Sequence, residues 1–68
     1  MTLEEFKTSI YSIEKPTYWR GGQFVFNTID SLYRVARTVQ FNDGIDCFYD
    51  DSKIDQFIIA CYNRLNKN

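Results

Sequence analysis

The sequence predicts an all-α fold, a compact three-helix bundle that forms a single domain over residues 1–68. Three stretches carry apolar residues at the three- and four-residue spacing of one helix face. A chain this short lies near the lower size limit for independent folding, so its core must be dense. Six Phe, five Tyr and one Trp meet that requirement, because each ring buries a large area on few rotatable bonds.

The first helix is predicted to begin after Thr2, because Thr2 and Glu5 have the spacing of a capping box. We expect Pro16 to end it, since the residue before a proline is pushed out of helical geometry. Its apolar face is formed by residues spaced three, four and three apart: Leu3, Phe6, Ile10 and Ile13.

The central helix, around which the others are expected to pack, is predicted from about Gly22 to Thr38. Its polar side carries Gln23, Asn27, Asp30 and Arg34. Its apolar stripe and the two aromatic residues that widen it are Val25, Ile29, Leu32, Ala36, Phe26 and Tyr33.

An irregular acidic loop is predicted between the second and third helices, with a strong turn signal at residues 42–44 (Asn-Asp-Gly). The flanking alternation also permits a short hairpin, but an isolated two-stranded pair is only marginally stable. We therefore favour a loop held by a buried Phe48. Ser52 and Asp55 resemble a second capping box at the start of the third helix. The apolar stripe of that helix is Ile54, Phe57, Ile58, Cys61 and Leu65.

No catalytic constellation is visible, so we expect the chain not to be an enzyme and to need no metal or cofactor. The sequence lacks histidine, the usual general base and a common metal ligand. Cys47 and Cys61 lack zinc-site spacing, and Cys61 on an apolar stripe suggests a buried, inert thiol. Gly21 and Gly22 lack a Walker or dinucleotide pattern, which favours a tight turn or close packing over a phosphate site.

The net charge is only −1, which argues against a basic nucleic-acid binder. The longest apolar run is far too short to span a membrane. The first five residues lack the basic and apolar regions of a signal peptide. We therefore expect a cytoplasmic location and no membrane contact.

Two surfaces are predicted to bind a partner. The acidic loop suggests docking on a basic surface such as the RNA-binding channel of a nucleoprotein, although a solvated loop with helix capping is the more ordinary explanation. The aromatic–basic triplet at residues 18–20 suggests stacking on unpaired bases or an interface anchor, although Trp19 also suits the end of a bundle. The residues concerned are Asp43, Asp46, Asp50, Asp51, Tyr18, Trp19 and Arg20.

A third predicted surface lies off the main apolar stripes. Helical projection places Phe24 and Val35 on one flank of the central helix, and Ile59 opposite the core face of the last helix. Single exposed apolar residues are ordinary, but a contiguous patch indicates an interface. We therefore predict homodimerisation or partner docking through this flank.

Two segments carry a resemblance to known proteins. Residues 19–27 read WRGGQFVFN, and residues 46–51 read DCFYDD. They resemble small uncharacterised bacterial and phage-borne proteins with a WRxGQxxFN pattern followed by DxFY and acidic residues. The likeness spans roughly residues 17–66, with Cys47 where the relatives often have proline. It implies an all-helical fold and a mobile-element setting, and assigns no active site.

Stand-alone phage proteins of this size commonly bind and block a larger host machine, an analogy that is independent of fold. The composition, with many Ile, Asn, Lys, Tyr and Phe, is similar to that of AT-rich Bacteroidota-type genomes. Small inhibitors of RNA-guided nucleases, including Cas13-type effectors, are known from such bacteria and their phages. We therefore expect an anti-CRISPR-like inhibitor that binds a host defence nuclease, with or without its guide RNA. The alternatives are a small RNA-binding module and a structural subunit that homo-oligomerises.

Overall fold

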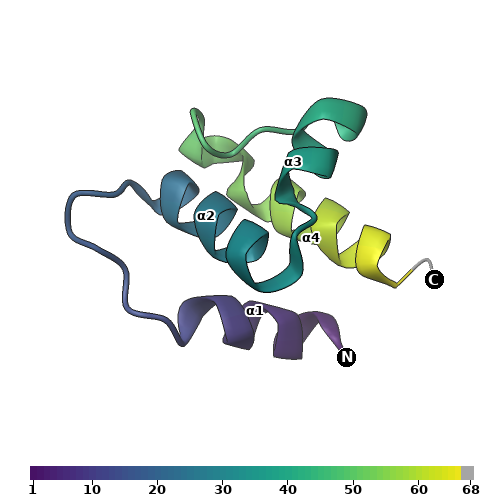
Figure 1. The fold of residues 1–68 in the computed structure, drawn as a ribbon, viewed down its shortest axis with the longest axis horizontal. Coiled ribbons are helices and arrows are strands. Elements are labelled where there is room, and N and C mark those ends of the chain that lie inside the picture. Colours follow the sequence, from purple (N-terminus) through teal and green to yellow (C-terminus); the bar gives the residue numbers. More distant parts are fainter. Residues whose placement is uncertain (67–68) are drawn as a thin grey trace.

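Four α-helices enclose one apolar core in the computed structural model, which describes residues 1–66 (Figure 1). They are α1 (Leu3–Tyr11), α2 (Gly21–Tyr33), α3 (Ala36–Thr38) and α4 (Ile54–Leu65), with a turn of π-helix, η1 (Val39–Asp43), and a short 3-10 helix, η2 (Asp51–Lys53). The described residues contain no strand, so the all-α prediction is confirmed. The three-helix arrangement is not confirmed, because the second predicted helix is divided into α2 and α3. Among residues 1–66, no helix combines the length and apolar character needed to cross a membrane.

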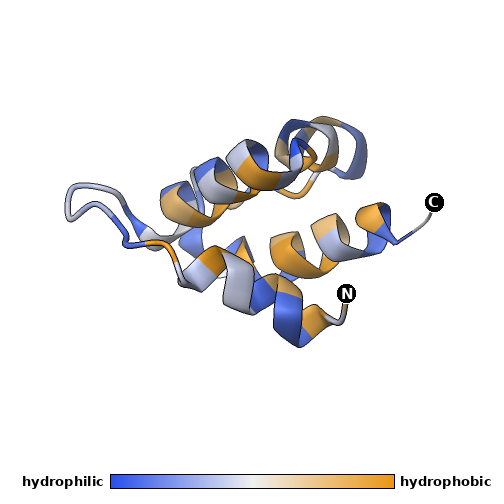
Figure 2. Ribbon diagram, turned by 60° about the horizontal axis from the view of Figure 1, so that its bottom comes forward, coloured by the Kyte–Doolittle hydropathy of each residue, from blue (hydrophilic) through white to orange (hydrophobic). Residues whose placement is uncertain are grey.

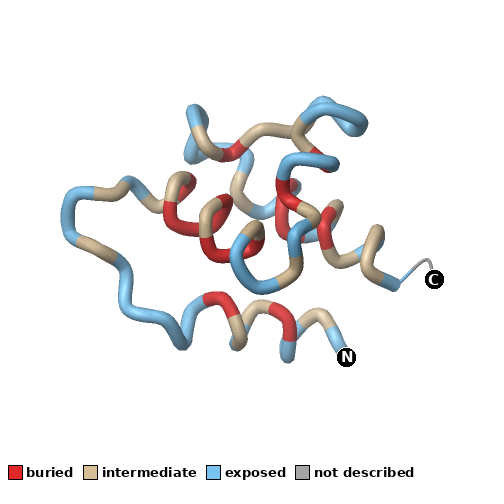
Figure 3. The backbone as a smooth tube through the Cα atoms, viewed as in Figure 1, coloured by how far each residue is buried: buried red, intermediate tan, exposed pale blue. Residues whose placement is uncertain are grey.

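The core lies where α1, α2 and α4 face one another. Figure 2 shows hydrophobic residues on the inner sides of these helices, and Figure 3 shows that the same sides are buried. Residues 12–15 and 17–18 of the long connection between α1 and α2 are exposed. The largest fully buried side chains come from all three helices, from η1 and from the loop before η2: Phe6, Phe57, Ile10, Ile29, Ile58, Val25, Val39, Cys47 and Cys61.

The predicted capping box at the start of α1 is confirmed. The Thr2 hydroxyl accepts a hydrogen bond from the Glu5 amide at 3.1 Å, and the Glu5 carboxylate accepts one from the Thr2 amide at 2.7 Å. These bonds hold the pKa of Glu5 below its usual value. The helix ends at Tyr11 and not at Pro16, so Ile13 lies beyond it and is exposed, contrary to the predicted stripe.

The predicted helix from Gly22 to Thr38 is interrupted at Arg34. Arg34 has φ 58° and ψ 32°, the left-handed conformation, and its amide donates to the carbonyls of Ile29 and Asp30. The change in chain direction lets Ala36 reach the core from a new helix, whereas Leu32, predicted to be in the core stripe, is exposed. The single-stripe prediction was therefore wrong at Leu32.

The connection from η1 to α4 is an irregular loop, so the hairpin alternative is wrong for the described chain. The π-helical turn ends at Gly44, which has φ 68°. The loop is anchored by Cys47, which is fully buried, and not by Phe48, which is only partly buried.

The predicted second capping box at Ser52 and Asp55 does not form. Instead the Asp50 carboxylate accepts from the Ser52 amide at 3.0 Å and from the Ser52 hydroxyl at 2.6 Å, which starts η2. The cap of α4 falls at Lys53, which makes no side-chain cap bond. Asp50 therefore takes the capping role assigned to Ser52.

The predicted oligomer flank is wrong in its geometry. Phe24 is only 3% exposed and belongs to the core, and Val35 packs partly buried against the core. The ring of Tyr11 lies 6.3 Å from that of Phe24, so the end of α1 covers the side of α2 that helical projection left open. Of the three flank residues, Ile59 alone is exposed.

Arg34 provides a test of the helix break. A residue with a side chain in the left-handed region is disfavoured by about 1 kcal/mol, and glycine is not. Arg34→Gly is therefore expected to be about 1 kcal/mol more stable than Arg34→Ala, measured by urea unfolding. Both variants remove the same charge, so the difference isolates the backbone. Equal stabilities would contradict the left-handed conformation.

Candidate functional site

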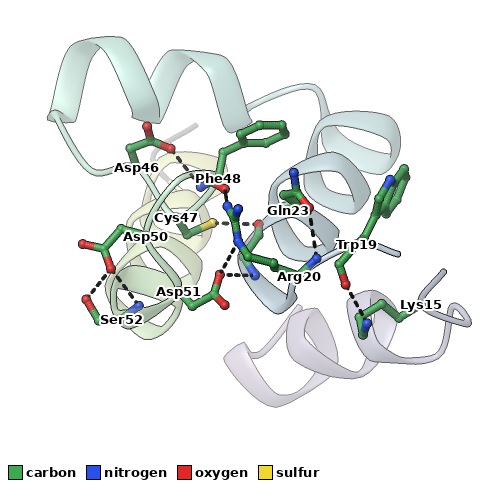
Figure 4. Close-up of polar contacts among 11 residues, drawn as sticks. Lys15, Trp19, Arg20, Gln23, Asp46, Cys47, Phe48, Asp50, Asp51 and Ser52 are labelled. Atoms are coloured by element: carbon green, nitrogen blue, oxygen red, sulfur yellow. Dashed lines mark hydrogen bonds and ion pairs between the residues drawn. The ribbon is translucent and has the colours of Figure 1, made fainter. Parts of the chain in front are cut away.

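The two motif segments, residues 19–27 and 46–51, fold against each other at the start of α2 (Figure 4). Gly22 is buried directly under the backbone of the second segment. A Cβ atom on Gly22 would lie 1.9 Å from the Cys47 carbonyl oxygen and 2.7 Å from Asp51 Oδ1. The Cys47 thiol donates to the Gly22 carbonyl at 3.4 Å. Only glycine permits this approach, as the close-packing interpretation of the glycine pair predicted.

Asp51 caps α2 from a distance of 29 residues along the chain. Its Oδ1 accepts a hydrogen bond from the Gly22 amide at 3.0 Å, and Arg20 Nε lies 3.6 Å from the same oxygen. The Arg20 guanidinium also donates to the Phe48 carbonyl, and the Arg20 amide donates to Gln23 Oε1 at 3.0 Å. An internal carboxylate therefore occupies the position at which a helix N-terminus would bind an external anion.

The other three acidic residues predicted to bind a partner also make internal bonds. Asp43 receives two hydrogen bonds from the Arg64 guanidinium, at 2.9 and 3.0 Å, which raise the pKa of Arg64. Asp46 accepts from the Phe48 amide at 2.8 Å. The pKa of Asp50 is lowered by its bonds to Ser52. These contacts give each carboxylate a structural role, and a partner-binding role for them remains a prediction.

In the predicted triplet at residues 18–20, the Tyr18 and Trp19 rings pack edge-on at 6.1 Å, and Arg20 is directed away from Trp19. Tyr18 is exposed, whereas Trp19 is partly buried against the core and its carbonyl accepts from Lys15 Nζ at 2.7 Å. Figure 4 shows the Arg20 guanidinium directed toward Phe48 and Asp51, away from Trp19. Tyr18 is the most exposed ring of the triplet, and a partner-binding role for the triplet remains a prediction.

A surface that the sequence did not indicate lies on the other side of the second motif segment. We call it the aromatic groove. It is a hollow of about 450 Å³ between α2, η1 and the following loop. Phe41 and Tyr49 are 80% and 76% exposed, the highest values among large apolar side chains after Tyr18. Its lining residues are Phe26, Asn27, Arg37, Gln40, Phe41, Phe48 and Tyr49.

The wall of the aromatic groove is held by rings that pack edge-on or tilted against one another. The Phe48 ring lies edge-on to Phe26 at 5.4 Å and to Tyr49 at 4.8 Å, and Phe26 packs on Phe57 at 5.5 Å. Such pairs favour one arrangement of the rings. The sequence signal that could have indicated the groove is the pair of aromatic residues on either side of the turn at residues 42–44, Phe41 and Tyr49.

The two cysteines of the described chain are free thiols inside the core. Cys47 and Cys61 are free and buried, and burial raises the pKa of each thiol to about 12. Thiolate is the reactive form, so both thiols are inert at neutral pH. Within residues 1–66, no group of three or more Cys, Asp or Glu side chains is placed to hold a metal ion.

Comparison of the chain with family models, with curated proteins and with solved structures found no match.

Gly22 and Gly21 provide a matched pair of variants. Gly22→Ala drives a Cβ atom into the Cys47 backbone, so we expect a loss of at least about 3 kcal/mol of unfolding free energy, or no folded protein. The Cβ of Gly21→Ala would meet only the end of the Ile54 side chain at 3.4 Å. Alanine favours the helix there, so stability should stay the same or rise by up to about 1 kcal/mol. Circular dichroism during urea unfolding measures both. Similar effects of the two changes would refute the close approach.

Asp51 tests the long-range cap. Asp51→Ala leaves the Gly22 amide without its acceptor and should cost about 1–2 kcal/mol in chemical denaturation. Asp51→Asn keeps an acceptor and removes the charge, so its cost should be smaller. Asp55→Ala, an exposed position in the first turn of α4, serves as the control and should cost about 0.5 kcal/mol. An Asp51→Ala protein as stable as the control would disprove the cap.

Proposed function

We propose that this chain acts by binding a larger protein through the aromatic groove, and that its target is a host defence nucleoprotein whose activity the binding blocks. The observation that carries the proposal is the pair of exposed rings, Phe41 and Tyr49, at the edges of one groove. The role is one of binding, without a chemical step.

Exposed aromatic rings add little to the stability of a small domain. Phe41 lies in η1 and Tyr49 in the loop after Cys47, and most of each ring faces solvent. Aromatic residues and arginine are enriched where protein interfaces concentrate their binding energy, and Arg37 lines the same groove. The volume of the groove suits one or two inserted side chains.

The packed rings in the wall of the aromatic groove favour binding by a preformed surface. Phe26 is buried and rests on Phe57 in the core, and Phe48 is fixed against it. A surface that is ordered before contact loses less entropy on association than a mobile one. This supports recognition of a folded partner by a small rigid domain.

The choice of target follows from the resemblance described above. Four of the groove residues belong to the two segments that carry it: Phe26 and Asn27 to the first, Phe48 and Tyr49 to the second. The resemblance to phage-borne proteins thus falls on the wall of the proposed docking surface. It suggests that inhibition of a defence complex, such as a Cas13-type effector, is the role of the groove.

The two alternatives have weaker support. An RNA-binding module would need several cations along a phosphate path, and the net charge of the chain is −1. A structural subunit that assembles through Phe24 and Val35 would need both exposed, and Phe24 lies in the core.

A phage-plating assay tests the proposal. A phage targeted by a Cas13-type effector should form plaques again on bacteria that carry the effector and also express the wild-type chain. With the double variant Phe41→Ala/Tyr49→Ala the plaque count should be at least about tenfold lower than with the wild-type chain, as expected for two interface anchors. Its unfolding free energy should change by no more than about 1 kcal/mol, because both side chains are exposed.

Tyr18→Ala is the matched control, since it removes an equally exposed ring outside the groove. It should restore plaques as the wild type does. Loss of recovery in Tyr18→Ala with full recovery in the double variant would place the function at the aromatic–basic corner. No recovery by the wild-type chain against a panel of RNA-guided effectors would refute the proposed target.

A further inference from the structure

We infer that the partner segment bound in the aromatic groove carries a carboxylate beside an apolar side chain, and that Arg34 and Arg37 receive this carboxylate. The inference rests on the proposed function and specifies the chemistry of the partner. It is carried by a second hollow that adjoins the aromatic groove.

The second hollow, of about 470 Å³, is lined by Asp30, Ser31, Arg34 and Arg37. Arg37 lines both hollows, so a bound segment can reach the two at once. The Arg37 side chain is 76% exposed and has one ion pair, with Nε 3.7 Å from Asp30 Oδ2. Arg34 makes no ion pair with any residue of the chain from 1 to 66. The second hollow thus contains two guanidinium groups and one carboxylate, and it meets the aromatic groove at Arg37.

The backbone conformation of Arg34 supports the same inference. A left-handed helix cap is usually glycine, because any side chain there costs free energy. The described contacts show no bond of the Arg34 side chain that offsets this cost within the fold. Residues held in such strained conformations cluster at functional sites. A guanidinium in the second hollow, which shares Arg37 with the aromatic groove, gives the strained position a use in recognition.

The charge balance favours a protein carboxylate over nucleic acid. One uncompensated positive charge matches one carboxylate, which a guanidinium binds by two parallel hydrogen bonds. A nucleic-acid strand presents a phosphate at each nucleotide and needs several cations in a row. The overall charge of −1 opposes such a polyanion. The aromatic groove then takes the apolar side chain next to the carboxylate.

Selection from a random dodecapeptide phage-display library on the immobilised protein tests the inference. Clones that depend on the aromatic groove are kept by counter-selection on Phe41→Ala/Tyr49→Ala. We expect these clones to share Asp or Glu beside an aromatic or aliphatic residue. A synthetic peptide from the selection should bind about tenfold more weakly to Arg34→Gln/Arg37→Gln than to the wild type. An analogue of the peptide with Asn or Gln in place of its acidic residue should bind the wild type about tenfold more weakly than the peptide itself does. Lys7→Gln/Lys53→Gln, with the same charge change elsewhere, should bind within about twofold of the wild type.

Neutral or basic consensus peptides, an empty selection, or equal binding by the arginine variant would overturn the inference. The inference would also be overturned, in favour of RNA, if the wild type bound a fluorescent 20-nucleotide oligouridylate more tightly than the selected peptide and the arginine variant lost this binding. The plating assay separates this failure from that of the proposed function. If Phe41→Ala/Tyr49→Ala loses plaque recovery and Arg34→Gln/Arg37→Gln keeps it, only the carboxylate inference fails. If both variants keep it, the groove has no role in inhibition.

Discussion

The close approach of the Cys47 backbone to Gly22 is the constraint on which the rest of the structure depends. A loop can lie this close to a helix only where the helix has no Cβ atom. Once it does, Cys47 is buried, Asp51 reaches the Gly22 amide, and Phe48 meets Phe26. The loop leading into α4 is thereby tied to the start of α2.

This constraint gives a physical role to the two motif segments, residues 19–27 and 46–51. Arg20 donates to the Phe48 carbonyl and approaches Asp51, so charged residues that look functional in the sequence serve to join the segments. The glycine pair at the start of α2 serves close packing, and the Asp51 carboxylate occupies the helix N-terminus where a phosphate would bind. The segments support the aromatic groove indirectly, because they fix the ring of Phe48 in its wall.

Local signals in the sequence were enough for part of the fold. The Thr2–Glu5 capping box depends on residues within one turn, and the buried face of α4 follows from spacing alone. The break at Arg34 has no local signal, because no glycine or proline stands there and the conformation is set by burial of Ala36 and Val39. The groove was equally hidden, since it joins residues from three separate segments. Sequence periodicity describes one element at a time and carries no information on such a surface.

The features that agree with local rules and those that break them lie in different parts of the molecule. Caps, buried rings and the Asp43–Arg64 pair all add stability within the fold. The strained Arg34 and the exposed Phe41 and Tyr49 add little, and they line two hollows that share Arg37. Positions that depart from the requirements of folding are where function is expected, because the departure has no compensation inside the domain. Three departures on adjoining hollows have a common explanation if that surface is completed by a partner.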